Sequence, residues 1–247
     1  MKSLLIAVIA SSALASSASA AEIHVFCSNG IRAVVEELRP KFEQATGDKL
    51  VLKYEPSTQL KKRIDAGEPF DLTILTTALI DDEIKAGKLA ADSRTILARS
   101  GLGVSIRSGA KKPNISTVDA FKKALLNAES VTYAQQGASA APFEVLVAKL
   151  GITSQLRPKY NLKNTAAEVG DAVSSGLVEL GIAPVSEILP VRGVDLVGPF
   201  PKDVQSYVEM TGAVSANAKE KDAAKKLLAF ITAPANLPII KMKGMER

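Results

Sequence analysis

The turns at 27–30 and 56–58 carry side chains suited to binding an anion. Cys27-Ser28-Asn29-Gly30 follows a short run of β-forming residues and leads into a helical pattern, and Ser57-Thr58 occupies the same place in the next unit. Hydroxyls and free backbone N–H groups at the positive end of a helix favour negative charge. Ser and Thr are also the ordinary N-cap residues, so each turn alone is weak evidence for a ligand. Their recurrence after two neighbouring strands favours an anion site.

A third turn, Gly137-Ala138-Ser139-Ala140-Ala141, consists of small residues between a strand pattern and a helix pattern. It lacks the G-x-G-x-x-G spacing of a dinucleotide site and the G-K-S/T of a phosphate-binding loop. Small side chains allow main-chain amides to approach a ligand closely. They also allow tight packing of a strand on a helix, and the pattern alone leaves both interpretations open.

The counts of rare residue types exclude several kinds of chemistry. The chain has one Cys, one His and no Trp, so it has no disulfide and no Cys/His zinc site, and we expect no metal site and no cofactor. A nucleophilic catalytic group would have to use His24, and Cys27 is expected to be a small core residue. We therefore predict a protein that is not an enzyme. The net charge of +5 is spread over basic clusters in separate elements, which predicts no nucleic-acid binding.

The N-terminus has the pattern of an export signal. Lys2 provides a positive start, 4–10 an apolar stretch, and Ala18-Ser19-Ala20 a small-x-small cleavage motif. A membrane anchor would need roughly 20 continuous apolar residues, and serines interrupt this segment too early. We predict a signal peptide over residues 1–20, cleaved after Ala20, and a periplasmic mature protein.

Strand and helix patterns then alternate along the chain. The alternation is typical of an α/β fold in which helices connect parallel strands. Pro40 should kink or split the first helix. The expected strands are 22–26, 49–54, 71–75, 101–108, 131–133, 160–162, 177–182, 194–197 and the extended segment 204–214, and the expected helices are 31–46, 59–66, 79–85, 118–127, 143–150, 169–175 and 219–232.

The mature chain as a whole resembles the periplasmic solute-binding proteins of ABC importers, and within them the molybdate-binding branch. The segments that carry the resemblance are 22–30, 42–47, 63–71, 115–121, 180–182, 223–234 and 243–246. The resemblance implies the α/β, two-lobe, type II periplasmic-binding-protein fold, in which each lobe is a mixed sheet flanked by helices.

The same resemblance implies how the lobes are joined and what they do. Two crossing segments, near 101–104 and 199–208, would divide the chain into lobe 1 (21–101 and 200–247) and lobe 2 (102–199). A ligand would bind in the cleft, with hinge closure of the type known for periplasmic binding proteins. The expected partners are a small anionic or polar ligand and a membrane permease, with the protein itself a monomer.

Ligand contacts follow residue by residue from the same resemblance. The hydroxyls of Ser28 and Ser57, the main chain at Ser139 and the amide near Ala166 match the family's oxyanion donors, while the family's tyrosine falls at Pro184. Proline offers neither a hydroxyl nor an N–H, so a tetrahedral ligand needs another donor, such as Thr76 or Ser186. The full set of expected ligand-binding residues is Ser28, Asn29, Ser57, Thr58, Thr76, Ser139, Ala166 and Pro184.

The resulting expectation is a receptor for a small, molybdate-like oxyanion. A small organic solute on the same fold is the alternative. A periplasmic enzyme and a scaffold or adhesion protein are the remaining hypotheses.

Overall fold

The computed structural model describes residues 20–247. The predicted signal peptide therefore lies outside the described residues, apart from Ala20. Within residues 20–247, no helix combines the length and the apolar character needed to cross a membrane.

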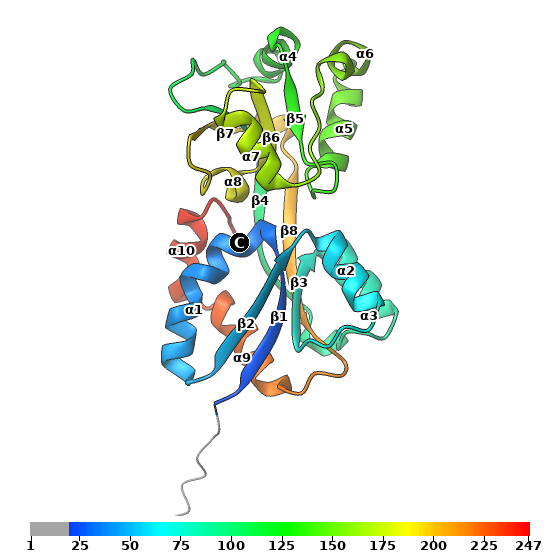
Figure 1. Cartoon of the computed structure of the whole chain (residues 1–247), viewed down its shortest axis with the longest axis vertical. Coiled ribbons are helices and arrows are strands. Elements are labelled where there is room, and N and C mark those ends of the chain that lie inside the picture. The colour runs from blue at the N-terminus through cyan, green and yellow to red at the C-terminus, as the bar shows by residue number, and fades with distance from the viewer. Residues whose placement is uncertain (1–19) are drawn as a thin grey trace, which may run out of the picture.

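The elements form two groups joined by two long strands (Figure 1). We name these groups lobe 1 and lobe 2. Lobe 1 contains β1 (Glu22–Ser28), η1 (Asn29–Ile31), α1 (Arg32–Thr46), β2 (Lys49–Glu55), α2 (Ser57–Asp65), β3 (Leu72–Thr76), α3 (Thr77–Lys85), η2 (Ala91–Ser93), α9 (Lys221–Thr232), η5 (Pro234–Asn236) and α10 (Leu237–Met242). Lobe 2 contains α4 (Val118–Asn127), β5 (Val131–Tyr133), α5 (Ala140–Lys149), α6 (Thr153–Leu156), η3 (Arg157–Lys159), α7 (Ala166–Ser174), β6 (Leu180–Pro184), α8 (Val185–Ile188) and β7 (Val194–Pro199). The joining strands are β4 (Thr95–Arg107) and β8 (Tyr207–Val214), the latter preceded by η4 (Lys202–Val204).

The strands follow one path, β2-β1-β3-β8-β4-β6-β5, with β7 also paired to β4. In lobe 1, β1 pairs in parallel with β2 and β3, and β3 pairs antiparallel with β8. In lobe 2, β5 and β6 are parallel, and β4 runs antiparallel to β6 and β7. Each lobe therefore has a mixed sheet, as predicted.

Strand β4 changes partners part-way along its length. Its first half pairs with β8 up to Gly101, and from Leu102 onward it pairs with β6 and β7. One continuous strand thus belongs to both lobes. The lobe boundaries at 101/102 and 199/200 stay a prediction, which this change of partner supports.

Most elements form for the local reasons that their sequences indicate. Helix α1 buries Val34, Val35, Leu38 and Phe42 at helical spacing and ends at Gly47, whose φ of 80° suits glycine. Pro40 does not split this helix, which runs unbroken from Arg32 to Thr46. Thr165 caps α7 by accepting a hydrogen bond from the Glu168 N–H.

Several predicted boundaries were wrong. The strand predicted at 101–108 begins at Thr95, the strand predicted at 177–182 lies at Leu180–Pro184, and the extended segment 204–214 becomes a strand only at Tyr207. The possible strand 160–162 is reduced to an isolated bridge between Val131 and Tyr160. Helices α6 and α10 were not predicted, because four and six residues are too few for a periodic pattern.

Candidate functional site

A small cavity of about 70 Å³, partly open to solvent, lies between the two lobes. Its lining comes from the turns that follow the strands, the position where open α/β sheets bind ligands. The lining residues are Ser28, Asn29, Pro56, Ser57, Thr58, Thr76 and Leu79 from lobe 1, and Ala134, Gln136, Gly137, Ala138, Asn164, Thr165, Ala166 and Glu187 from lobe 2.

Ser28 and Ser57 are joined in a buried chain of hydrogen bonds on the lobe 1 side. The Ser57 hydroxyl donates to Ser28 Oγ at 2.9 Å, and the Thr76 N–H donates to Ser57 Oγ at 3.2 Å. The Gly30 N–H reaches Ser28 Oγ at 3.5 Å. The Ser57 hydroxyl therefore already donates one hydrogen bond and accepts another. The Ser28 hydroxyl proton has no acceptor among the described residues and remains available for a ligand.

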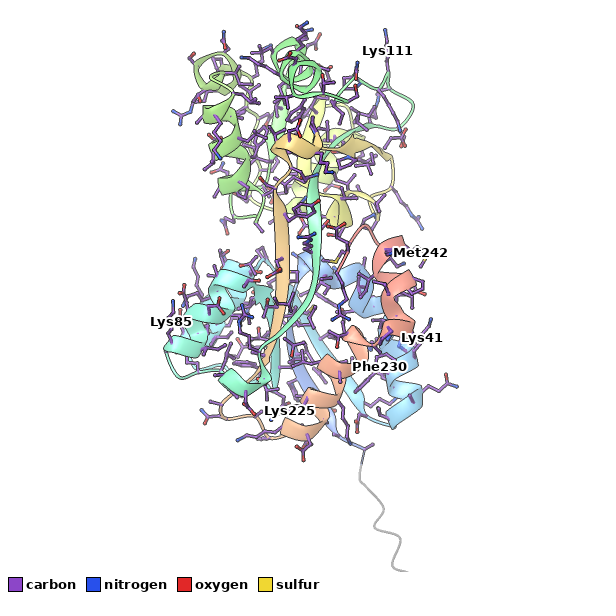
Figure 2. The ribbon with its side chains drawn as sticks, turned by 180° about the vertical axis from the view of Figure 1, so that it is seen from behind. Lys41, Lys85, Lys111, Lys225, Phe230 and Met242 are labelled. Carbon is purple, nitrogen blue, oxygen red and sulfur yellow. The ribbon has the colours of Figure 1, made fainter. Side chains whose placement is uncertain are left out.

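Four helices begin at the cavity wall. Thr58 lies in the first turn of α2, Thr76 is the N-cap of α3, Ala138 precedes α5, and Ala166 is the first residue of α7. The first N–H groups of an α-helix have no acceptor within the helix. No Lys or Arg is among the described lining residues. The lysines labelled in Figure 2, among them Lys41, Lys85 and Lys111, lie on separate elements at the outside of the molecule. The cavity thus presents neutral donors and positive helix ends to a ligand.

Glu187 is the one ionisable residue among the described residues that line the cavity. It lies in α8, directly after β6, and makes no hydrogen bond or ion pair with any residue of the range 20–247. Its carboxylate lies close to Gly30 in η1. A Cβ atom added to Gly30 would be 3.5 Å from Glu187 Oε1. Burial raises the pKa of this carboxyl to about 7.

Glu187 is not among the ligand residues predicted from the sequence. Ser186, the residue before it, is predicted only as a substitute for the donor that Pro184 lacks. An acidic residue soon after a strand, at the edge where the other ligand turns gather, was the available signal. It was weak because acidic residues are common in the first turn of helices.

The structure brings six of the eight predicted ligand residues to the cavity: Ser28, Asn29, Ser57, Thr58, Thr76 and Ala166. Ser139, the N-cap of α5, is 2 % exposed, and it lies outside the lining while its neighbours Gly137 and Ala138 are part of it. Pro184 ends β6, pairs with Leu102 and is also outside the lining. Ser186 donates its hydroxyl to the Gly30 carbonyl at 2.8 Å and is therefore occupied. Direct ligand binding stays a prediction for the whole set.

His24 and Cys27 lie outside the cavity lining. The His24 ring is half-exposed beside Glu22, at 3.2 Å. Cys27, which the sequence placed either in the core or at the border of the cleft, is fully buried in the core, and burial raises the pKa of its thiol. Within residues 20–247, no three His, Cys, Asp or Glu side chains gather in a way that could hold a metal ion.

The lobes touch each other across the cleft. Gln59 of α2 donates its amide to Gln136 of lobe 2 at 2.7 Å near the cavity mouth. At the opposite side, the bond from Ser186 to Gly30 joins α8 to η1. A ligand in the cavity would therefore contact both lobes at once.

A family model described as "Bacterial extracellular solute-binding protein" matches residues 23–246. The chain belongs to this family. The solute-binding protein is 29 % identical over 243 residues to an aconitate isomerase of Pseudomonas sp, covering 96 % of this chain and 92 % of that protein. It is 24 % identical over 237 residues to the molybdate-binding protein ModA of Azotobacter vinelandii, covering 94 % and 92 %.

Solved structures agree on the fold of the solute-binding protein. The periplasmic molybdate-binding protein of Azotobacter vinelandii superposes with a TM-score of 0.77 at 18 % identity, covering 91 % of this chain and 99 % of that one. These matches confirm the predicted family resemblance and the two-lobe α/β fold. One relative is named as an enzyme, so the prediction that the chain is not an enzyme is not settled by family membership.

Proposed function

We propose that the protein binds a small anion in the cleft between its lobes and delivers it, in the periplasm, to the membrane permease of an ABC importer. The observation that carries this proposal is the convergence of helix N-termini and the Ser28 hydroxyl on one cavity without a lining Lys or Arg. Such neutral donors suit the oxygen atoms of an anion. A ligand that bridges both lobes binds the closed state better than the open one, which is the condition for closure.

The proposed ligand carries a compact group of anionic oxygens. A tetrahedral oxyanion of the molybdate type and a small carboxylic acid both carry it, and the relatives' names include both kinds of compound. The position of Pro184 removes one donor that the molybdate binders use, and Glu187 adds a carboxyl to the wall. The donor missing at Pro184 supports the carboxylic acid over molybdate, whereas Glu187 faces either anion.

Thermal unfolding of the mature protein tests the proposal. The samples contain molybdate, tungstate, sulfate, phosphate, citrate, cis-aconitate or trans-aconitate. An anion present at a hundredfold excess over its Kd should stabilise the folded state by about 2.7 kcal/mol. Calorimetric titration of the stabilising anion then gives its Kd. A melting temperature unchanged by every one of these anions would contradict the proposed function.

A second candidate function, isomerisation of a bound unsaturated acid, is favoured by Glu187. A carboxyl with a pKa near the working pH is suited to accept and return a proton, and Glu187 lines the cavity without a partner. The aconitate samples of the same experiment are therefore followed by proton NMR. Interconversion of the two isomers that disappears in Glu187→Gln would establish this activity. Binding without interconversion would leave the receptor function alone.

A further inference from the structure

Glu187 stands where a bound anion would meet it. Its carboxylate oxygen lies against Gly30, two residues beyond Ser28 on the same turn, and both Ser28 and Glu187 line the cavity. The Ser28 hydroxyl offers a proton to a ligand, whereas an ionised Glu187 offers only lone pairs. An anion held by Ser28 and the helix ends would then face a second negative charge.

The surroundings of α8 do not neutralise Glu187. The elements packed on α8 are η1, β4, β6 and β7, and η1 and β6 contain no ionisable side chain. On β4, Arg99 pairs with Glu246, and Arg107 lies beside Gly176. On β7, Asp195 accepts hydrogen bonds from Ser108 and Gly109. Beyond these elements, Arg32 follows η1 and lies over the Tyr54 ring, and Lys243 pairs with Glu37.

Burial is accordingly the one cause of the raised Glu187 pKa, with no charged neighbour contributing. A nearby bound anion would raise it further, since like charges favour the protonated carboxyl. A protonated Glu187 removes the repulsion and supplies an O–H donor. An O–H···O⁻ bond of this kind is stronger than a bond between neutral groups.

We propose that Glu187 and the bound anion share one proton, so that binding of a fully ionised anion takes up one proton from solvent. The proton comes from water or buffer and bonds to a Glu187 carboxylate oxygen, which donates it to the ligand; no other bond changes. This proposal rests on the proposed anion-binding function. It implies that, above about pH 7, a ligand already carrying an acidic proton, such as hydrogen phosphate, binds without proton uptake, so its affinity rises relative to that of a fully ionised anion as the pH increases.

The sign of the pH dependence follows from the two protonation states. Below about pH 7, free Glu187 already holds the proton, so binding takes up none and the affinity is constant. Above that pH, the free carboxyl is ionised and the bound one is protonated. The affinity for a fully ionised anion should then fall about tenfold for each unit of pH, as proton linkage requires.

The experiment measures Kd and proton uptake for molybdate, sulfate and trans-aconitate, each from about pH 6 to about pH 9, where each is essentially free of ionisable protons. Calorimetric titrations in two buffers with different ionisation enthalpies give the number of protons taken up. For the parent protein we expect uptake to approach one proton at the alkaline end. For Glu187→Gln, whose amide donates without titrating, we expect no uptake, a constant Kd and tighter binding than the parent above about pH 8.

Glu129→Gln is the matched control, because Glu129 is exposed and is not among the residues that line the cavity. It should reproduce the parent's pH dependence, and circular dichroism should show both variants folded across the range. A parent protein that binds a probe with the same Kd and no proton uptake throughout would overturn the proposal, as would a slope that persists in Glu187→Gln. Failure of every probe to bind the parent at any pH contradicts the proposed function itself, and the shared proton with it.

Discussion

Ser28 and Ser57 have unequal roles, although they occupy equivalent turns. Ser57 donates its proton to Ser28 and accepts the Thr76 N–H, so its hydroxyl holds the turn in place. Ser28 keeps its own proton for the cavity. We therefore expect Ser28 to contact the ligand and Ser57 to orient the Ser28 hydroxyl.

Replacing Ser28 should consequently affect affinity most. Ser28→Ala removes one hydrogen bond to a charged ligand, for which about 1.5–3 kcal/mol is typical, so we expect at least a tenfold higher Kd in calorimetric titration. Ser57→Ala should raise the Kd less and lower the melting temperature more, because it leaves the buried Thr76 N–H without its acceptor. Ser154→Ala, at an exposed serine outside the cavity, should change neither quantity. A larger loss of affinity in Ser57→Ala than in Ser28→Ala would show the assignment to be wrong.

At the scale of single elements, a threonine N-cap stabilises the start of α7. Thr165 accepts the Glu168 N–H and lines the cavity together with Ala166. Thr117 makes the same type of bond for α4, accepting the Ala120 N–H at 3.1 Å, but lies outside the cavity lining. Thr165 and Thr117 are thus threonine caps that make the same type of bond, and of the two only Thr165 lines the cavity.

Variants of Thr165 and Thr117 allow the effect of a cap on helix stability to be distinguished from its effect on ligand binding. Thr165→Ala and Thr117→Ala should each cost about 1 kcal/mol of unfolding free energy, measured by urea denaturation, because each loses one N-cap bond. Of these two variants, we expect only Thr165→Ala to raise the Kd of the bound anion, because α7 begins at the cavity wall and α4 does not. Equal affinity in the two variants would mean that the α7 terminus does not contact the ligand.

At the scale of the whole molecule, two strands and two side-chain contacts determine how the lobes meet. Strands β4 and β8 run between the lobes (Figure 1), and β4 changes partner between Gly101 and Leu102. The bond between Gln59 and Gln136 joins the two lobes beside the cavity, which Gln136 lines. Gln136 lines the cavity, whereas Gln59 does not, so Gln59 can be replaced without removing a ligand contact.

Gln59→Ala should therefore weaken closure alone. One exposed hydrogen bond contributes about 0.5–1.5 kcal/mol at most, so we expect a Kd roughly two- to tenfold higher, mainly through faster dissociation. Small-angle X-ray scattering of the ligand-free variant should show a larger radius of gyration than that of the parent. Gln135→Ala, at the exposed neighbour of Gln136, is the control and should match the parent. A Gln59→Ala protein with parental dissociation rate and size would argue against a latch at this position.

The sequence alone determined the features that depend on neighbouring residues. The alternation of strand and helix patterns and the donor turns at Ser28 and Ser57 follow from hydrophobic period and cap chemistry, which act within a few residues. Tertiary structure decided the features that depend on distant residues. The Ser186 hydroxyl donates a hydrogen bond to the Gly30 carbonyl, 156 positions away, and the Glu187 carboxylate lies close to the same turn. No local pattern encodes such meetings, because they exist only once β4 has joined the two sheets and the lobes have closed on each other.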